Sequence, residues 1–352
     1  LMDTNIRAKA LSTATGINHS DLIGILNNEL GDPKALDEFV KYGDIFAKAN
    51  PISPILHIVS GNTPEAAIQS VTRGLLVGAK NLVKLPRNGI KEFYDFLDKL
   101  PSEMLDLVET SSERETSNEW IDLAQVIIIF GSDETVMDIA SRTSPLQTII
   151  SHNHKVSFAV VDKDDQKEAA DLAARDINKY DQMGCLSPHC IYVNPKEQPR
   201  SFAARLAKSL DELNKNNPPK DRDIATDSQI DHLRRSYEFR SSNDTSVQIW
   251  KSNNNTNWTV VYEDEPQFAQ SPLGQFVFVK PMPENLIEAL SIILGSISTF
   301  AIYPFSLEMA KSLAHIGATR YCPLGSSQNP SIYWHHDGCQ SLAPLVSWQN
   351  AG

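Results

Sequence analysis

The chain has 352 residues, of which 41% are apolar and 22% charged, and its formal net charge at pH 7 is −12. This composition is typical of a globular protein with one or two folded domains. The acidic balance argues against general nucleic-acid binding, which needs clustered Lys and Arg, but it permits a local basic patch for an anionic ligand. The apolar runs are too short to span a bilayer, so we expect no membrane span.

Cysteine usage and the first residues indicate a compartment. The four cysteines, at positions 185, 190, 322 and 339, form no Cys-x-x-Cys pair, so a disulfide scaffold is improbable in a chain of this length. The charged residues Asp3, Arg7 and Lys9 interrupt any apolar core near the start, which argues against a signal peptide. We therefore expect reduced thiols and a cytoplasmic location.

The N-terminal half changes pattern at Pro51. Before it we expect amphipathic helices, one ending at Gly31 and a further one running through Leu36 to Val40. After it, short apolar strands alternate with helices. The expected strands are 52–59, 81–85, 126–130, 148–150 and 156–161, and the expected helices are 66–76, a stretch around Trp120, a helix after the turn at 131–134, and 166–179. This alternation predicts an α/β protein with a mainly parallel sheet that is covered on both faces.

The C-terminal half continues the alternation after one interruption. We expect strands at 190–193, 276–279, 300–303 and 320–322. Between them, residues 214–257 contain Pro218-Pro219 and many Asn and Ser residues, and we interpret them as a surface excursion with a helix at 231–240. The segments 247–250 and 258–262 flank an Asn-rich turn, which predicts a hairpin.

Cys185 is the first candidate for catalytic chemistry. Taken alone, a cysteine is more often a small buried hydrophobe than a nucleophile. Here Gly184 precedes it and Ser187-Pro188 follows, which is poor sequence for a core strand and typical of an exposed loop. A metal cluster of Cys185, His189 and Cys190 is the alternative, but it lacks a convincing fourth ligand, so we expect no metal.

The turn Ser60-Gly61-Asn62-Thr63-Pro64 follows the first expected strand. Ligands of open parallel sheets collect at the carboxyl ends of the strands, so the amide of Asn62 could meet a reacting oxygen there, and Ser60 is a candidate for cofactor binding. The alternative, equally plausible from local sequence, is that Asn62 caps the following helix.

Two further strand ends carry candidate cofactor ligands. Lys84 and Arg87 end the strand at 81–85, where two cations could hold a ribose hydroxyl and a phosphate, although a solvated charged loop is the simpler reading. Gly131 and Ser132 form a strand-to-helix turn of the kind that binds a diphosphate. The turn does not match G-x-G-x-x-G, so it is a weak signal by itself.

Taken in order, these segments resemble the aldehyde dehydrogenase superfamily and, within it, the LuxC-type acyl-CoA reductases. The resemblance covers nearly the whole chain and is carried by five groups of residues: 57–64 with 74–87, 127–136, 154–161, 182–193 and 334–348. It implies an aldehyde dehydrogenase-like α/β fold with two Rossmann-like lobes and mainly parallel sheets. It also implies a cofactor-binding domain at 1–184, rejoined by about 325–352, and a catalytic domain at 185–324 that starts at the nucleophile loop.

The resemblance also implies roles for individual residues. Cys185 looks like the family nucleophile, which attacks an acyl-CoA thioester to give an acyl-cysteine. Asn62 looks like the side-chain donor of the oxyanion hole, with the Cys185 backbone N–H as the second donor. Lys84 matches the lysine that binds the adenine ribose, and Gly131 with Ser132 matches the cofactor-phosphate turn.

The roles of the histidines are less defined by the resemblance. His189 could supply a proton to the thiohemiacetal or favour the Cys185 thiolate, or it could be an ordinary polar residue on a strand edge. His335, His336 and Asp337 belong to a recurrent family motif for which the sequence gives no role.

Two departures from the superfamily pattern affect the expected reaction. In hydrolytic aldehyde dehydrogenases a glutamate activates water, and aligning the lysine of that motif on Lys155 puts Ser151 at the glutamate position. Without a carboxylate base there, water competes poorly for the acyl-cysteine, which favours acyl-CoA reduction. NAD-preferring relatives commonly carry a glutamate three residues after the strand-end lysine. Arg87 occupies that position here, and a cation there favours NADPH.

The expected function is NADPH-dependent reduction of a fatty acyl-CoA to the fatty aldehyde. The alternatives are a short-chain acylating aldehyde dehydrogenase and a non-catalytic relative that binds nucleotide or acyl-CoA. A metal-dependent enzyme using Cys185, His189 and the His335-His336-Asp337 group is a more distant one. The resemblance implies an acyl-protein synthetase as a possible partner and a homo-oligomer, with Leu342 to Trp348 as a candidate interface.

Overall fold

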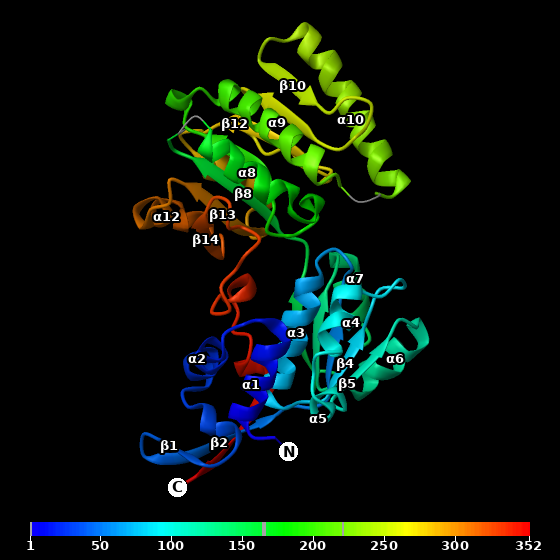
Figure 1. The fold of residues 1–352 in the computed structure, drawn as a ribbon. Coiled ribbons are helices and arrows are strands. Elements are labelled where there is room, and N and C mark those ends of the chain that lie inside the picture. The colour runs from blue at the N-terminus through cyan, green and yellow to red at the C-terminus, as the bar shows by residue number, and fades with distance from the viewer. Residues whose placement is uncertain (1, 164–166, 220–221) are drawn as a thin grey trace. The chain divides into compact units, whose positions relative to one another are not determined.

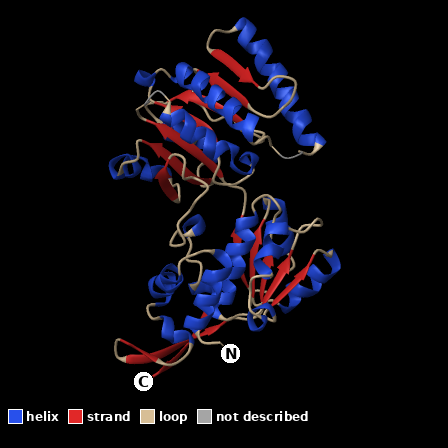
Figure 2. Cartoon of the chain, in the orientation of Figure 1, coloured by secondary structure: helices blue, strands red, loops and turns tan. Residues whose placement is uncertain are grey.

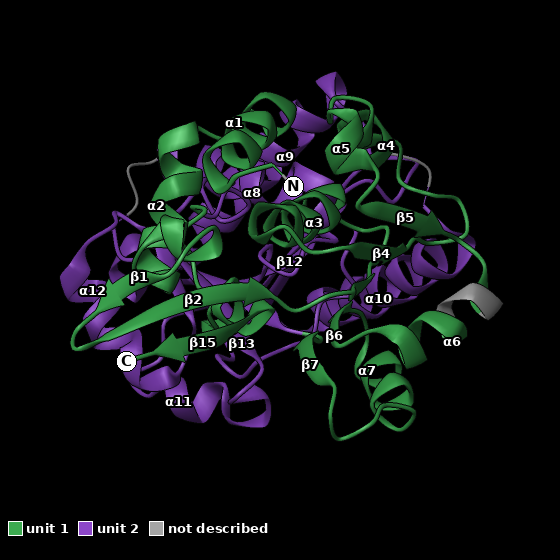
Figure 3. Ribbon diagram, turned by 90° about the horizontal axis from the view of Figure 1, so that it is seen from below, with its two compact units in different colours: residues 1–154, 331–352 green, residues 155–330 purple. Residues whose placement is uncertain are grey.

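The computed structural model describes residues 2–163, 167–219 and 222–352. The chain forms two compact units (Figure 3): residues 1–154 with 331–352, and residues 155–330. The sequence places the boundary at 184, but in the structure it follows His154. The reason is that β8 (Val156–Val161) pairs with β9 (Pro188–Val193) in the sheet of the second unit, so the segment before Cys185 already belongs to that unit.

The first unit starts with helices that pack on its core (Figure 1). They are α1 (Thr4–Thr15), α2 (His19–Leu30) and the short 3-10 helix η1 (Pro33–Leu36). The expected helix through Leu36 to Val40 is wrong, because the chain there forms the hairpin β1 (Val40–Tyr42) and β2 (Ile45–Pro51). Its turn contains Gly43, whose φ of 59° lies in the left-handed region that glycine readily adopts.

A five-stranded sheet, with its strands all parallel, organises the first unit. Its order is β5 (Val108–Ser111), β4 (Asn81–Lys84), β3 (Ile55–Ile58), β6 (Val126–Phe130) and β7 (Thr148–His152). The connecting helices are α3 (Pro64–Val77), α4 (Lys91–Leu97), α5 (Ser102–Leu105), α6 (Arg114–Leu123) and α7 (Asp133–Ala140). Successive residues of β6 alternate between two cores: Ile128 packs with α3 and α4, and Ile127 packs with Trp120 of α6. Both faces of the sheet are therefore covered.

The C-terminal segment returns to the first unit. It contains the 3-10 helices η6 (His336–Gly338) and η7 (Ala343–Leu345) and ends in β15 (Val346–Ala351), which pairs antiparallel with β2 in a three-stranded sheet. Leu342, Leu345 and Val346 are buried in the core of this unit, whereas Trp348 is 40% exposed. Only the end of the expected interface segment, Leu342 to Trp348, therefore has exposed surface for a partner.

Among the described residues, the second unit is built on a seven-stranded sheet in which β10 (Val247–Lys251) alone is antiparallel to its neighbour. Figure 2 draws the strands of both units as red arrows. Besides β8 and β9, its strands are β10 (Val247–Lys251), β11 (Thr259–Glu263), β12 (Phe276–Pro281), β13 (Ile297–Tyr303) and β14 (Arg320–Pro323), in the order β10-β11-β12-β9-β8-β13-β14. The antiparallel pairing of β10 with β11 confirms the predicted hairpin. The α/β class with mainly parallel sheets, predicted from the sequence, is confirmed in both units.

Helices cover both faces of this sheet. The helices are α8 (Glu168–Asn178), α9 (Pro199–Asn216), α10 (Ile224–Asn243), α11 (Leu286–Ala289) and α12 (Leu307–Leu313), with 3-10 turns η2 (Lys179–Gln182), η3 (Pro195–Glu197), η4 (Ser291–Ile293) and η5 (Ala314–Ile316). Residue 166, the expected start of α8, and residues 220–221 lie outside the described residues. The region expected as a surface excursion is part of the core, because Ile230 and Tyr237 of α10 are buried against the sheet. Among the helices described, none has the length and apolarity to cross a membrane.

A buried polar cluster fixes α3 on the first sheet and makes a testable prediction. His57 contacts Ser70 Oγ at 2.7 Å and Asn81 Oδ1 at 2.9 Å. A Cβ added at Gly74 would lie 1.9 Å from that Asn81 oxygen. We expect Gly74→Ala to lower the free energy of unfolding by about 2–4 kcal/mol, because the buried Asn81 side chain must move and lose its partner. Urea denaturation measures the change.

Gly24→Ala is the matched control for this prediction. A Cβ at Gly24 of α2 would lie 2.1 Å from the Tyr333 hydroxyl, but Tyr333 is 39% exposed and can rotate away. Alanine also has about 1 kcal/mol better helix propensity than glycine. We expect Gly24→Ala to be close to neutral. Equal destabilisation by both substitutions would contradict the special role of the Asn81 contact.

Candidate functional site

The parallel strands of the first unit end at one edge of its sheet, and the candidate residues of that unit lie there. Asn62 follows β3, Lys84 is the last residue of β4, and Gly131 follows β6. Ligands of open parallel sheets bind beyond this edge. The topology of the sheet therefore brings to one edge three residues that are far apart along the chain.

Asn62 is exposed on the bend between β3 and α3. Helix α3 begins at Pro64 and its N-cap residue is Thr63. The alternative in which Asn62 caps the helix is therefore wrong. Ser60, before the bend, is half-buried. An exposed amide at the carboxyl end of a parallel strand is suited to donating a hydrogen bond to a ligand oxygen.

The cations that follow β4 lie within electrostatic reach of a carboxylate, that of Glu113. Lys84 Nζ donates to the Leu85 carbonyl at 2.6 Å, and partial burial lowers its pKa, while the charge of Glu113 acts in the opposite direction. Arg87 is exposed. Glu113 comes from the chain after β5, the strand that pairs with β4, so sequence reasoning missed it.

The turn after β6 is less suited to a phosphate than its sequence indicates. The Gly131 N–H already donates to the His152 carbonyl at 3.3 Å, and Ser132 Oγ accepts from the Thr135 N–H at 3.3 Å as the cap of α7. Asp133 and Glu134 occupy the first turn of α7, where carboxylates compete with an anionic ligand for the N-terminal dipole. Phosphate binding by Gly131 and Ser132 stays a prediction.

Cys185 lies on a sharp loop before β9. Its side chain is exposed, whereas Gly184 and Leu186 on either side are buried. The Ser187 N–H donates to the Gly184 carbonyl at 2.9 Å, and Ser157 Oγ donates to the Cys185 carbonyl at 2.7 Å. The loop therefore presents the sulfur to solvent from a backbone that is hydrogen-bonded on both sides.

The turn before this loop has an uncommon backbone. Tyr180, Asp181 and Gln182 all have positive φ, at 56°, 54° and 62°. Asp181 forms a bidentate ion pair with Arg222, with one contact of 2.6 Å, and accepts from Gln275 Nε2 at 2.9 Å. Such conformations cost about 1–3 kcal/mol each and persist only where surrounding contacts hold them, often next to functional groups.

A half-buried guanidinium, that of Arg320, interacts electrostatically with Cys185. Burial lowers the pKa of Arg320, and the charges of Cys322, Asp176 and Cys185 raise it. Burial also raises the pKa of Asp176 to about 6, although its carboxylate accepts from the Gly325 N–H at 2.8 Å. A guanidinium within electrostatic reach of a thiol favours the thiolate. Nothing in the local sequence signals this contact, because Arg320 comes from β14.

His189 lies in an inner strand of the second sheet. It is 2% exposed in β9, which lies between β12 and β8 inside the sheet. The strand-edge reading is therefore wrong, and the burial gives no support to proton donation. Cys190 beside it is fully buried, which raises the pKa of its thiol to about 12. Among the described residues, the group that is close enough to share a metal ion contains neither Cys185 nor His189.

The C-terminal motif meets the end of β7. His152 Nδ1 lies 2.7 Å from Asp337 Oδ2, and His336 Nε2 lies 3.7 Å from the same oxygen. These atoms fall within 4.8 Å of one another, a spacing that could accommodate a cation. Arg73, a cation itself, lines the same small cavity as both histidines. The C-terminal sequence motif includes His336 and Asp337, but nothing in the local sequence indicates His152 as their partner.

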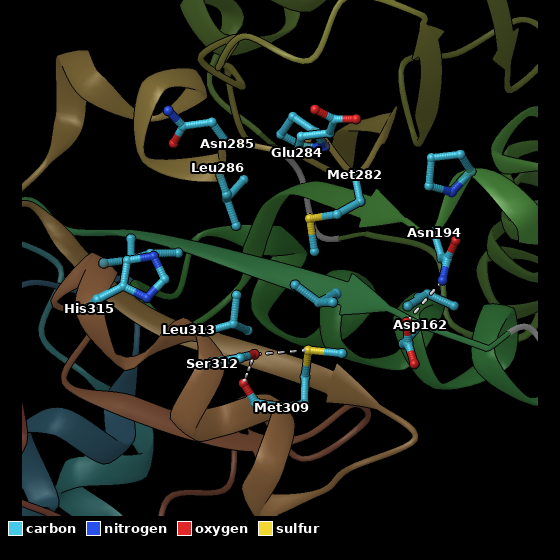
Figure 4. A pocket seen from close by; sticks show the side chains of 15 residues that line it. Asp162, Asn194, Met282, Glu284, Asn285, Leu286, Met309, Ser312, Leu313 and His315 are labelled. Atoms are coloured by element: carbon cyan, nitrogen blue, oxygen red, sulfur yellow. Dashed lines mark hydrogen bonds between the residues drawn. The ribbon is translucent and has the colours of Figure 1, made fainter.

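The second unit contains a larger cavity, whose lining side chains Figure 4 shows. Its volume is about 340 Å³, and its lining includes Asp162 after β8, Asn194 after β9 and Met309 of α12. Asn194 Nδ2 donates to Asp162 Oδ1 at 3.0 Å, so part of its polar lining is already paired. Cys185 precedes β9, so this cavity is remote from the sulfur.

Solved structures with the same fold include aldehyde dehydrogenases. An NAD-dependent benzaldehyde dehydrogenase from Corynebacterium glutamicum matches with a TM-score of 0.68 and 11% identity, covering 99% of this chain and 85% of that one. The glyceraldehyde-3-phosphate dehydrogenase GapN from Methanocaldococcus jannaschii, complexed with NADP, matches with a TM-score of 0.68 and 11% identity, covering 100% and 90%. These similarities establish the fold.

Sequence comparison identifies the family. The long-chain acyl-protein thioester reductase of Aliivibrio fischeri is 26% identical, over 93% of this chain and 70% of the relative. The enzyme of that name from Vibrio harveyi is 23% identical, over 93% and 70%. The family model described as acyl-CoA reductase (LuxC) matches residues 3–348. The chain therefore belongs to the LuxC family of acyl-CoA reductases.

Proposed function

We propose that this protein reduces a fatty acyl thioester to the fatty aldehyde through an acyl-Cys185 intermediate, with NADPH as the reductant. The observation that carries the proposal is the exposed Cys185 on a loop held from both sides, with Arg320 in electrostatic reach. The names of the relatives favour a long-chain acyl group carried on a protein. The description of the matching family model favours CoA as a carrier.

The proposed reaction assigns roles to Cys185, to Asn62 and to a bound nucleotide. The Cys185 thiolate attacks the thioester carbonyl, forming a new C–S bond, and the tetrahedral oxyanion then expels the carrier thiolate. The Asn62 amide and the Cys185 backbone N–H are the proposed donors to that oxyanion. NADPH, when bound, supplies a hydride to the acyl carbon, and the thiohemiacetal oxyanion on Cys185 then collapses to aldehyde and regenerates the thiolate.

The end of β7 supports reduction over hydrolysis. Ser151, at the position of the water-activating glutamate in hydrolytic aldehyde dehydrogenases, is exposed and has no carboxylate. Water is therefore a weak competitor for the acyl-cysteine. A non-catalytic relative would not need the exposed thiol, and a short-chain acylating enzyme differs only in acyl length.

Single-turnover acylation tests the proposal. The protein is mixed with radiolabelled tetradecanoyl-CoA without nucleotide, and the label on denatured protein is counted. We expect close to one label per chain, which NADPH then converts to labelled aldehyde. Absence of label would overturn the proposal and favour a binding function. Faster acylation by acetyl-CoA than by tetradecanoyl-CoA would favour the short-chain alternative. A co-expressed acyl-protein synthetase that donates the label directly would identify the proposed partner.

Removing the charge of Arg87 is expected to change cofactor preference. A guanidinium on a 2′-phosphate contributes about 1.5–3 kcal/mol, so Arg87→Ala should weaken NADP binding about 10- to 100-fold and leave NAD binding nearly unchanged. Fluorescence titration with NADPH and NADH measures both affinities. Lys91→Ala, which removes an exposed cation at the start of α4, is the control. Equal loss of affinity for both nucleotides would show that Arg87 does not select NADP, which would leave Glu113 as the candidate ribose ligand.

A further inference from the structure

We propose that Gln328 is a positioning residue for thioester reduction: its side-chain amide holds the turn that carries Cys185. This turn sets the directions of the Cys185 side chain and of the Cys185 backbone N–H, which is a proposed donor to the oxyanion. The inference rests on the proposed function and extends it to a residue for which the local sequence gives no signal. The residues that carry it all belong to the second unit, 155–330.

Cys185 occupies the second position of a four-residue turn. The Ser187 N–H donates to the Gly184 carbonyl at 2.9 Å, which closes the turn around Cys185. Ser157 Oγ, from β8, donates to the Cys185 carbonyl at 2.7 Å. The Cys185 N–H and Cα–Cβ bond lie between these fixed points. Their directions therefore depend on the groups that hold Gly184 and Ser187 in place.

Gln328 holds the Ser187 end of the turn. Its Nε2 donates to Ser187 Oγ at 2.5 Å, and the Ser187 hydroxyl donates to the Asp176 backbone carbonyl at 3.3 Å. Because a carbonyl can only accept, the hydroxyl proton points to Asp176, and the group that faces Ser187 Oγ must be the NH2 of Gln328. Ser187 is fully buried and Gln328 is 9% exposed, so this chain of hydrogen bonds is shielded from water.

The same side chain lies against the Gly184 end of the turn. A Cβ added at Gly184 would lie 2.8 Å from Gln328 Oε1 and 2.9 Å from Gln328 Nε2. Glycine is therefore needed at this position for the close approach of the amide to the backbone. Both ends of the turn that carries Cys185 contact one side chain, and that side chain comes from a loop far along the sequence.

The loop that carries Gln328 follows β14 and is held by charged groups. Arg320 donates to the carbonyls of Ser326, at 2.9 Å, and Ser327, at 2.5 Å. The carboxylate of Asp176, which is 2% exposed, accepts from the Ser327 N–H at 3.1 Å. Hydrogen bonds to charged groups are stronger than those between neutral groups. Gln328 therefore extends from a fixed support toward the turn.

A purely structural role for Gln328 is the alternative, because any buried amide needs hydrogen-bond partners. Two observations favour positioning. The contacts of the amide fall on Gly184 and Ser187, which lie on either side of Cys185. Arg320, which holds the loop of Gln328, also interacts electrostatically with Cys185. The network therefore converges on the exposed sulfur.

Positioning and simple stabilisation predict different kinetics. Acylation needs the Cys185 N–H to point at the oxyanion, and a small displacement of such a donor weakens transition-state binding. Alkylation of Cys185 by iodoacetamide forms no oxyanion and needs only an accessible sulfur. Loss of the Gln328 contact should therefore slow acylation much more than alkylation.

Gln328→Met tests the contact, because methionine keeps the length of the side chain and removes the donor. We expect the acylation rate constant, measured by rapid quench with radiolabelled tetradecanoyl-CoA, to fall about 10- to 100-fold. The dissociation constant of acyl-CoA and the alkylation rate should stay within about threefold of wild type. Asn329→Ala is the matched control. It removes the neighbouring exposed amide, which contacts Lys179 Nζ at 2.7 Å, and it should acylate at the wild-type rate.

A double-mutant cycle tests the approach to Gly184. In Gly184→Ala the added methyl group displaces the amide of Gln328, and acylation should fall by at least ~10-fold. In Gln328→Ala the amide is absent, so adding Gly184→Ala should cause little further loss. Such non-additivity is the mark of two residues that act through one contact. Additive losses would overturn the assigned contact.

The outcomes separate this inference from the proposed function. A wild-type protein that takes up no label would refute the proposed function and, with it, this role of Gln328. A labelled wild type with a Gln328→Met variant that acylates normally would overturn the inference alone. Equal losses of acylation and alkylation would also overturn it, because the sulfur itself would have become less accessible or less ionised. If Gln328→Met does not fold, judged by thermal unfolding, Ser187→Ala decides: normal acylation in that variant refutes the positioning contact.

Discussion

Cys185→Ala is expected to retain no acyl label and to lose aldehyde formation by at least ~10⁴-fold, because removing the nucleophile removes the covalent route itself. The side chain is exposed on a loop whose backbone is fixed by Ser157 and Ser187, so the change to alanine leaves that backbone its contacts. Label counting after a single turnover and aldehyde quantification under steady-state conditions measure the two effects.

Cys339→Ala is the matched control for the loss of an exposed thiol. Cys339 is the other exposed cysteine, and its removal should leave the label on the protein. Peptide mapping of the labelled wild type should place the acyl group on the peptide that contains Cys185. Undiminished label on Cys185→Ala, or label that maps to Cys339, would refute the assignment of the nucleophile.

Most of the fold could be predicted from the sequence because its signals are local. In β6, successive apolar residues fill two cores, and Gly131 breaks the strand before α7. The same kind of signal predicts the hairpin of β10 and β11 around an Asn-rich turn. Where local signals conflict, the prediction fails: residues 36–40 have helical spacing, but a hairpin whose turn contains Gly43 pairs Val40 with Ala47.

Long-range arrangement could not be predicted in the same way. The boundary after His154 depends on the pairing of β8 with β9 and β13, and nothing in the local pattern shows which sheet a strand joins. The same limit applies to the region after Asn216, where the burial of Ile230 on the sheet is a tertiary property.

The same difference between local signals and long-range contacts applies to the candidate site. The exposure of Cys185 followed from glycine on one side and Ser-Pro on the other, and the position of Asn62 followed from its place after a strand. The partners of these residues come from other elements of the fold. Arg320 interacts electrostatically with Cys185 and Glu113 with Lys84, and Asp337 contacts His152. For His189, proximity to Cys185 in sequence is misleading. The side chain is buried in β9, within the sheet.

Asn62→Ala is expected to lower the rate of Cys185 acylation by about 10²- to 10³-fold, the usual effect of removing one oxyanion donor. The Asn62 amide is exposed and is not the cap of α3, so its loss should cost little stability. Because the donor acts on charge that develops in the tetrahedral intermediate, the acylation rate constant should fall while the dissociation constant of acyl-CoA stays within about twofold. Rapid-quench acylation over a range of acyl-CoA concentrations separates the two.

Alkylation by iodoacetamide gives this prediction its sharpest control. Displacement of iodide by the Cys185 sulfur forms no oxyanion, so Asn62→Ala should alkylate at the wild-type rate while it acylates slowly. Asn88→Ala, which removes an exposed amide from the loop after β4, should be normal in both reactions. If Asn62→Ala slows alkylation and acylation equally, the amide acts on the thiol or its loop. In that case the oxyanion of the thioester reaction must be stabilised by other donors.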